Sequence, residues 1–389
     1  MTEDIFVDTI FLVFSGAAVL ATLALAARQT LLMAYIALGV LFGPSVLGLV
    51  PDGELTAEIA HIGIMFLLFL LGLDLNPREL AHSLRRTSLV TFASSLVFAV
   101  IGLSIGLAFS FSFLEALILG AAMTFSSTII GLKLLPTTVL HHQRMGEIMI
   151  SVLLLQDLIA IATLLLLGAT ISGNTSWVDI FLVLLSLPGL ALFSWACARF
   201  ILLPLMARFD TFREYIFLVA IGWCLGMAEL AGTFGLSHEI GAFFAGVGLA
   251  TSPIAMYIAD SLRPLRDFFL VLFFFSVGAQ FDIAMIDDVF APAALTAIAA
   301  IVLKPLIFKA LLVATGETRS KATEIGFRLG QMSEFSMLLA ALAMNITAVS
   351  AQVSYTIQLA TIVTFVVSSY LVVLRFPTPI AIRDELRRD

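Results

Sequence analysis

Two polar stretches, TFSST at residues 124–128 and GQMSEF at residues 330–335, interrupt two long apolar segments of this chain. Each lies about 12 residues into its segment, which at about 1.5 Å per helical residue is about 18 Å from the segment's start. A break in a helix frees main-chain N–H and C=O groups, which an apolar phase tolerates only where protein covers them or where they line a cavity. The two stretches therefore predict two broken helices with polar midpoints.

The surrounding sequence is apolar enough to make the bilayer its solvent. Its 389 residues are 61% hydrophobic and 12% charged, and the mean hydropathy is +1.10, far above that of soluble domains. A crossing takes about 20 mostly apolar residues, so we predict an all-α membrane protein with about 13 transmembrane helices. They lie near 5–27, 30–50, 55–74, 86–111, 113–135, 145–170, 178–205, 213–231, 236–254, 265–281, 290–314, 322–346 and 351–374.

Basic residues gather in alternate loops between these spans. We assign 17 of the 20 Lys and Arg residues to these loops and to the span ends that flank them. The three that are left, Lys304, Lys309 and Arg328, lie inside predicted spans. The positive-inside rule then predicts an N-terminus outside and a C-terminus in the cytoplasm, as in a multi-pass protein of the cell inner membrane. The formal net charge of -7 gives no basic surface for nucleic acid, and membrane lipid is the expected surrounding.

Short loops connect the spans, which predicts one transmembrane domain over 1–376 followed by a cytoplasmic tail over 377–389, with no nucleotide-binding regulatory domain. The sequence has no HExxH, GxSxG or Walker pattern and no Cys/His metal spacing. We therefore expect neither an enzyme nor a bound cofactor.

The two broken segments are an odd number of spans apart, so their helices run in opposite directions. This is the geometry of an inverted repeat, pairing the fourth to sixth spans with the eleventh to thirteenth, and it is typical of secondary transporters. Ion and substrate sites in such folds lie where the broken helices meet.

Asp157 lies about 12 residues into the span near 145–170, close to the middle of the bilayer. An isolated carboxylate is costly there, so a proton and a metal cation compete to neutralise it. That competition is the simplest form of cation/proton antiport, and it makes Asp157 the candidate site for K⁺ or Na⁺. Gln156 adds a neutral carbonyl ligand. The alternative is a buried pair that only orients helices.

Other polar residues in the spans divide between the ion and the helix ends. Lys304 reaches a similar depth in the span near 290–314 and is the natural counter-ion of Asp157, or else satisfies helix carbonyls freed near Pro305. Glu334 either offsets the positive ends of the broken helices or lies on the ion path. The hydroxyl groups of Ser126, Ser127 and Thr128 serve freed backbone groups or the ion.

Six motifs in order give the chain a family resemblance. They are GVLFGPSVLG at 39–48, LFLLGLDL at 68–75, SST at 126–128, LQD at 155–157, GAFFAG at 241–246 and QMSEF at 331–335. Together they resemble the monovalent cation:proton antiporter-2 family, most closely the membrane domain of the Kef-type potassium/proton antiporters. The match runs from about Tyr35 to Phe335.

The resemblance implies a sodium/proton-antiporter-like fold with crossed broken helices, in a homodimer whose core moves as an elevator past a dimerisation scaffold. The core helices would be those at about 86–170 and 290–374, with the remainder mainly scaffold. Asp157 would be the cation/proton carboxylate and Lys304 the family's intramembrane lysine. Gln156 favours K⁺, since Asp-Asp relatives prefer Na⁺. The missing nucleotide-binding domain leaves room for a separate regulatory subunit.

Two alternative functions fit the same spans. One is sodium-coupled symport of an organic anion on a similar crossed-helix fold, and the other is a membrane sensor or channel subunit. Flux of protons against K⁺ or Na⁺ separates exchange from both.

Overall fold

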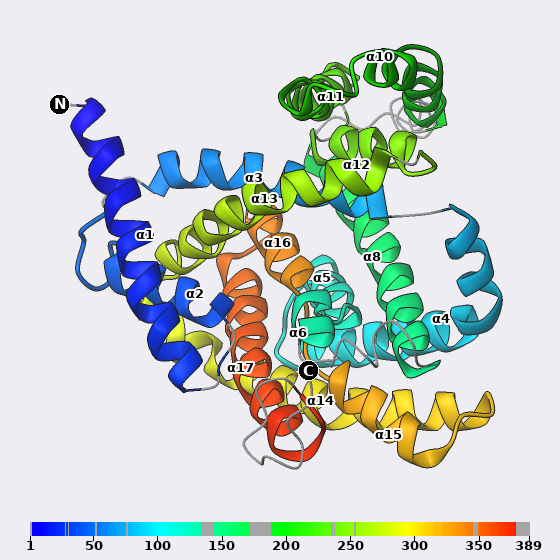
Figure 1. Ribbon diagram of the computed structural model, residues 1–389. Coiled ribbons are helices and arrows are strands. Elements are labelled where there is room, and N and C mark those ends of the chain that lie inside the picture. Colours follow the sequence, from blue (N-terminus) through cyan, green and yellow to red (C-terminus); the bar gives the residue numbers. More distant parts are fainter. Residues whose placement is uncertain are drawn as a thin grey trace. The chain divides into compact units, whose positions relative to one another are not determined.

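The computed structural model describes residues 2–27, 29, 31–50, 53–74, 77–133, 144–171, 188–234, 236, 238–252, 254–344 and 349–378 (Figure 1). Throughout these ranges the secondary structure is helical, with no strand. The helices are α1 (Thr2–Ala26), α2 (Leu31–Phe42), α3 (Gly53–Asp74), α4 (Pro77–Ala108), α5 (Phe113–Thr124), α6 (Thr128–Lys133), α8 (Arg144–Ile171), α10 (Leu203–Arg208), α11 (Arg213–Thr233), α12 (His238–Leu249), α13 (Ile254–Ala279), α14 (Ile286–Ala314), α15 (Arg319–Arg328), α16 (Glu334–Ala343) and α17 (Ala351–Arg375).

Every predicted span overlaps a helix, and the all-α prediction is confirmed for the described residues. Seven helices there are long and apolar enough to cross a membrane, and four shorter apolar helices accompany them. The count of thirteen spans and the inverted repeat remain predictions. The main difference is α13, which begins at Ile254 rather than near 265 and continues through Pro264. The predicted span at 178–205 lies partly outside the described residues.

The helix over Pro188–Arg208 changes its hydrogen-bonding pattern midway. A five-residue π-helical turn, Ala198–Leu202, precedes α10. Pro204 follows directly, at the start of α10, and it has no N–H to continue the α-helical ladder.

The chain divides into two compact units. The first contains Met1–Phe14, Leu41–Ala81 and Leu164–Gln280, and the second contains Ser15–Val40, His82–Thr163 and Phe281–Asp389. In the first unit α3 packs along α12 and α13, and α11 packs on α12 (Figure 1). Its core is almost entirely apolar and includes Phe66, Phe69, Met227, Ile258 and Leu262.

Glycines set the closest approach of α3 and α12. A Cβ added at Gly246 would lie 2.1 Å from the main-chain oxygen of Phe69, and one added at Gly72 would lie 2.4 Å from that of Phe243. No side chain fits at either position. The small residues thus allow the two helix backbones to touch, as in membrane helix pairs generally.

The second unit contains both predicted helix breaks. The helix α5 ends at Thr124, Phe125 is extended with φ -81° and ψ 146°, and α6 begins at Thr128. In the other, α15 ends at Arg328 and α16 begins at Glu334 after an extended Ser333. Both breaks are therefore confirmed where the polar stretches predicted them. Figure 1 shows α16 and α17 beside α5, and α14 packs on α15 and α17.

Serine side chains cap the helices that restart after each break. Ser127 Oγ accepts a hydrogen bond from Ile130 N (3.1 Å), and Ser333 Oγ accepts one from Phe335 N (3.2 Å). Ser336 completes a capping box at the start of α16 by bonding to the Ser333 N–H. Each cap satisfies N–H groups that the first turn of a helix leaves without a partner.

Candidate functional site

The two breaks touch each other inside the second unit. Ser126 Oγ donates to the carbonyl of Leu329 (2.9 Å), and Ser336 Oγ donates to the carbonyl of Ala122 (2.6 Å). A longer contact of 3.4 Å joins Gln331 Nε2 to the carbonyl of Ser127. Hydroxyl and amide side chains of each broken helix thus satisfy carbonyls of the other.

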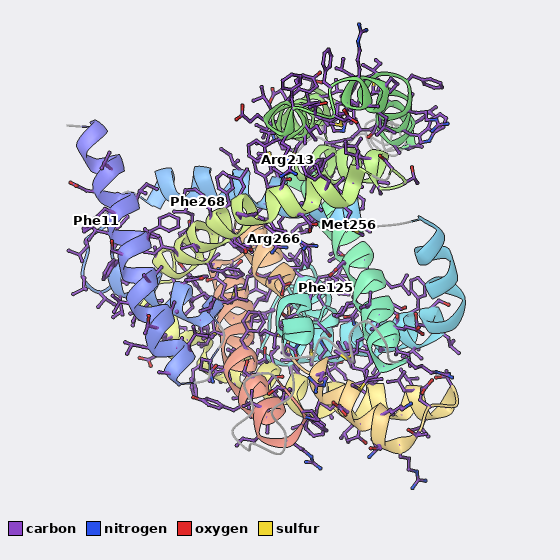
Figure 2. All side chains as sticks on the ribbon, viewed as in Figure 1. Phe11, Phe125, Arg213, Met256, Arg266 and Phe268 are labelled. Atoms are coloured by element: carbon purple, nitrogen blue, oxygen red, sulfur yellow. The ribbon has the colours of Figure 1, made fainter. Side chains whose placement is uncertain are left out.

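Lys304 lies between the breaks and is fully buried. Its Nζ donates to the carbonyls of Phe125 (2.7 Å) and Gln331 (3.0 Å), one from each break. Figure 2 labels Phe125 in the short connection from α5 to α6. The ammonium group also lies 5.1 Å from the centre of the Phe98 ring. Lys304 therefore neutralises the negative carbonyl ends that the breaks expose.

Direct pairing of Lys304 with Asp157 is not what the structure shows. Both residues are described, and no ion pair within 4.0 Å joins them. The hydrogen bonds of Lys304 are to carbonyls of the two breaks and not to carbonyls near Pro305. Its role as counter-ion of Asp157 stays a prediction.

Asp157 lies on α8 and is 3% exposed. Thr128 Oγ1, at the first residue of α6, contacts Asp157 Oδ1 at 3.4 Å and Oδ2 at 3.3 Å. No lysine, arginine or histidine in the described ranges forms an ion pair with this carboxylate. A buried carboxylate with one weak hydroxyl donor needs a proton or a cation to complete its environment.

Gln156 presents an open acceptor beside Asp157. Its Nε2 donates to the carbonyl of Thr124 (3.1 Å), while Oε1 is buried with no partner among the described residues. The orientation of the amide follows from chemistry, because a carbonyl can only accept and so must face the NH₂ group. The oxygen that remains is the neutral carbonyl that the sequence offers as a ligand, and its role in cation binding stays a prediction.

Glu334 adds a second acid to the site. It is 4% exposed at the first residue of α16, where the positive helix end favours a negative charge. Its carboxylate interacts electrostatically with that of Asp157, and Ser333 Oγ lies 3.4 Å from its Oε2. Two neighbouring buried carboxylates repel each other, so a bound proton or cation stabilises the pair.

The six predicted side chains around Asp157 thus divide into two groups. Thr128, Gln156 and Glu334 lie around Asp157, whereas Ser126, Ser127 and Lys304 bond to the main chain of the breaks. In this geometry Thr128 contacts Asp157, and Ser126 and Ser127 bond to main-chain atoms. The choice between ion and backbone roles for the three hydroxyls stays a prediction.

Sequence reasoning missed the support that α17 gives to the second break. Thr364 Oγ1 accepts from Met332 N (3.1 Å), and Ser368 Oγ donates to Gln331 Oε1 (3.1 Å). Thr361 Oγ1 lies 3.8 Å from Met332 Sδ. Thr361, Thr364 and Ser368 recur at helical spacing on one face of an otherwise apolar segment, and this spacing was a signal available in the sequence.

The chain matches a known family over nearly its whole length. The family model described as "Sodium/hydrogen exchanger, transmembrane" matches residues 11–374. The putative cation/proton antiporter YbaL of Escherichia coli K12 is 30% identical over 345 residues, covering 84% of this chain and 60% of the relative. The K(+) efflux antiporter 6 of Arabidopsis thaliana is 27% identical over 329 residues, which are 82% of this chain and 55% of the relative.

A third relative and a solved structure extend the comparison. The iron transporter MagA of Paramagnetospirillum magneticum is 30% identical, over 88% of this chain and 79% of the relative. The solved structure of the sodium proton antiporter MjNhaP1 from Methanocaldococcus jannaschii superimposes with a TM-score of 0.72 at 17% identity, covering 95% and 96% of the two chains. These relatives carry the names of transporters rather than enzymes, and the fold is that of the archaeal antiporter.

This chain is therefore an integral, multi-pass membrane protein that belongs to the transmembrane sodium/hydrogen exchanger family.

Proposed function

We propose that this chain is a secondary active transporter that exchanges a monovalent cation for protons at Asp157. The observation that carries the proposal is the pair of buried acids, Asp157 and Glu334, with no described cationic side chain paired to Asp157. Protonation and cation binding both relieve the repulsion of such a pair, and each excludes the other. Mutual exclusion at one site couples two opposite flows.

The cation would bind among oxygen atoms alone. Asp157 and Glu334 supply carboxylates, Gln156 Oε1 supplies a carbonyl without a partner, and Thr128 supplies a hydroxyl. Oxygen ligands of this kind suit hard cations such as K⁺ and Na⁺. We favour K⁺, with Na⁺ possible, because the Gln-Asp pair resembles Kef-type antiporters and because one relative bears the name K(+) efflux antiporter 6.

Alternating access of the elevator type is the proposed mechanism. The chain has two compact units, and the second contains the site together with the breaks that form it. This unit includes most of the proposed core helices at about 86–170 and 290–374. A site whose charge is neutralised by a proton or a cation can move through the bilayer at low free-energy cost. An empty site keeps its negative charge, and moving it through the bilayer is costly.

We further propose a homodimer in the cell inner membrane, with the N-terminus outside, the C-terminus cytoplasmic and regulation by a separate subunit. One observation supports an intermolecular contact on α11. A Cβ added at Gly222 or Gly226 meets no described atom within 4 Å, so this small-residue face is open to a second helix. Cross-linking of cysteines placed at these two positions measures the contact.

The test is a flux assay in proteoliposomes with an imposed pH gradient. External K⁺ should collapse the gradient, and comparison with Na⁺, Rb⁺ and Li⁺ gives the selectivity. Fe²⁺ is included as an arm because of the name of the relative MagA. Sodium-dependent uptake of a carboxylated solute without proton movement would contradict exchange and favour symport, and flux at channel rates would favour a channel subunit.

Asp157→Asn should abolish the exchange, because an amide has no negative charge to attract a cation and does not take up a proton. Asp288→Asn is the matched control, since it makes the same change at an exposed position of α14. Persistent exchange by the Asp157 variant at wild-type rates would overturn the assignment. Gln156→Asp tests the ion preference, and we expect it to lower the ratio of K⁺ to Na⁺ exchange.

A further inference from the structure

A second cationic side chain is buried in the second unit, away from Asp157. Arg328 is the last residue of α15 and is 1% exposed. The site described above does not use it. A guanidinium group is costly to bury, and it persists in an interior only where its donors and its charge are satisfied.

Arg328 is satisfied from two directions. Its Nε and Nη2 donate to Glu324 Oε1 at 3.0 Å and 2.8 Å, one turn earlier in α15. The same Nη2 donates to the carbonyl of Pro377 at 2.7 Å, just beyond the end of α17. One flat side chain thus fastens the end of α15 to the segment that leaves α17.

Aromatic contacts reinforce this fastening. The Arg328 guanidinium carbon lies 5.9 Å from the centre of the Phe376 ring, and that ring lies 5.8 Å from the ring of Phe327. Arg375 in turn lies 5.2 Å from the Phe327 ring. Such cation–aromatic contacts are attractive, and more strongly so where water is excluded. We call this group, Phe327, Arg328, Arg375, Phe376 and Pro377, the exit clamp.

The exit clamp lies next in sequence to the bonds that form the site. Leu329, which directly follows Arg328, accepts the hydrogen bond from Ser126. Gln331, two residues further, accepts from Lys304. Any shift in the end of α15 therefore changes the geometry of both breaks, because these contacts are to main-chain atoms that move with the helix.

We propose that Arg328 is a positioning residue for the ion site, which it holds in place through the exit clamp. The chain leaving α17 is by this route mechanically coupled to the second break and hence to the cation ligands. Lysine cannot replace the arginine, because an ammonium group has no planar fork to reach Glu324 and the Pro377 carbonyl together. The inference rests on the proposed exchange.

The experiment compares Arg328→Lys and Phe376→Ala in the proteoliposome assay. Both should raise the apparent KM for the transported cation by about threefold to tenfold, with a smaller change in the maximal rate. The double variant should show less than the product of the two single effects, because both changes break one clamp. Lys321→Gln, an exposed position on the same helix, is the control and should leave KM unchanged.

Arg328→Lys is also expected to impair folding, because the side chain is buried. Phe376→Ala is the second variant because its ring is only half-buried, so its loss should affect folding less. Wild-type KM in a well-folded Phe376→Ala protein, or strictly multiplicative effects in the double variant, would overturn the proposal. A fall in maximal rate alone, in proportion to lost protein, would show a purely structural role and also overturn it. Absence of exchange in the wild type would instead refute the proposed function.

Discussion

The two compact units of this chain bury different chemistry. In the described part of the first unit, the buried polar side chains are Thr9, Ser194 and Ser276, none of them charged. Among the described residues of the second unit, five charged side chains are buried: Glu115, Asp157, Lys304, Arg328 and Glu334. Charge in a membrane interior is expensive and is retained where it functions, so the second unit is where ion exchange is expected.

The units also differ in how their helices approach. Glycines bring α3 and α12 of the first unit into backbone contact, whereas hydroxyl and amide groups join the broken helices of the second. Close apolar packing gives a rigid scaffold, and polar contacts can rearrange when an ion arrives. Five substitutions test whether stability and transport divide along the same line.

Lys304→Met should have the largest effect. It removes the charge without leaving a new one, but the carbonyls of Phe125 and Gln331 lose their donor. Two unsatisfied carbonyls cost roughly 2–6 kcal/mol together. We expect a clear loss of thermal stability in detergent and loss of exchange. Wild-type exchange by this variant would show that the breaks do not depend on the ammonium group.

Gly246→Ala should come second, and it affects the first unit. The added methyl group would lie 2.1 Å from the Phe69 oxygen, and such overpacking costs about 1–3 kcal/mol. We expect lower thermal stability with an unchanged cation KM in the folded fraction. Gly189→Ala, where an added Cβ meets nothing within 4 Å, is the control. A KM change at Gly246 would break the division between the units.

Two serines, one in each unit, provide a matched comparison with the third-largest expected effect. Ser194 Oγ donates to the Phe244 carbonyl in the first unit, and Ser336 Oγ donates to the Ala122 carbonyl in the second, both at 2.6 Å. Alanine at either should cost about 1 kcal/mol of stability. Only Ser336→Ala should also alter exchange, measured as initial rate against cation concentration. Equal effects of both on exchange would contradict the comparison.

Thr128→Val should have the smallest effect. The hydroxyl contacts with Asp157 are long, at 3.3 and 3.4 Å, and a weak intramembrane hydrogen bond contributes about 0.6 kcal/mol. We expect an approximately threefold rise in cation KM and no change in thermal stability. Thr323→Val, on α15 where the hydroxyl donates to Arg319 O at 2.7 Å, is the control and should leave KM unchanged.

Much of the fold could be predicted from the sequence, because apolar length and polar interruption are local signals. The breaks at 124–128 and 330–335 could be placed since Ser127 and Ser333 cap helices from within their own stretches. Asp157 and Gln156 stood out because polar side chains are rare at that depth. None of these inferences needed to know which helices are neighbours.

The hydrogen-bond partners of the buried lysine and arginine could not be predicted from the sequence in the same way. Lys304 bonds to carbonyls 179 and 27 residues away in sequence, and depth alone does not distinguish those oxygens from the Asp157 carboxylate. Arg328 was placed inside a predicted span without a partner, because the Pro377 carbonyl lies 49 residues later and is found only once α15 and α17 are packed. Long-range hydrogen bonds depend on the fold that carries them.

The bonds of Lys304 also determine how the membrane voltage should act. If Lys304 keeps its proton and its bonds to the two main-chain oxygens throughout a cycle, its charge does not contribute to transport. If one cation then replaces one proton at Asp157, no net charge crosses the bilayer. Voltage provides about 2.3 kcal/mol per charge per 100 mV, and we expect this exchange to be insensitive to it, driven by the two concentration ratios alone.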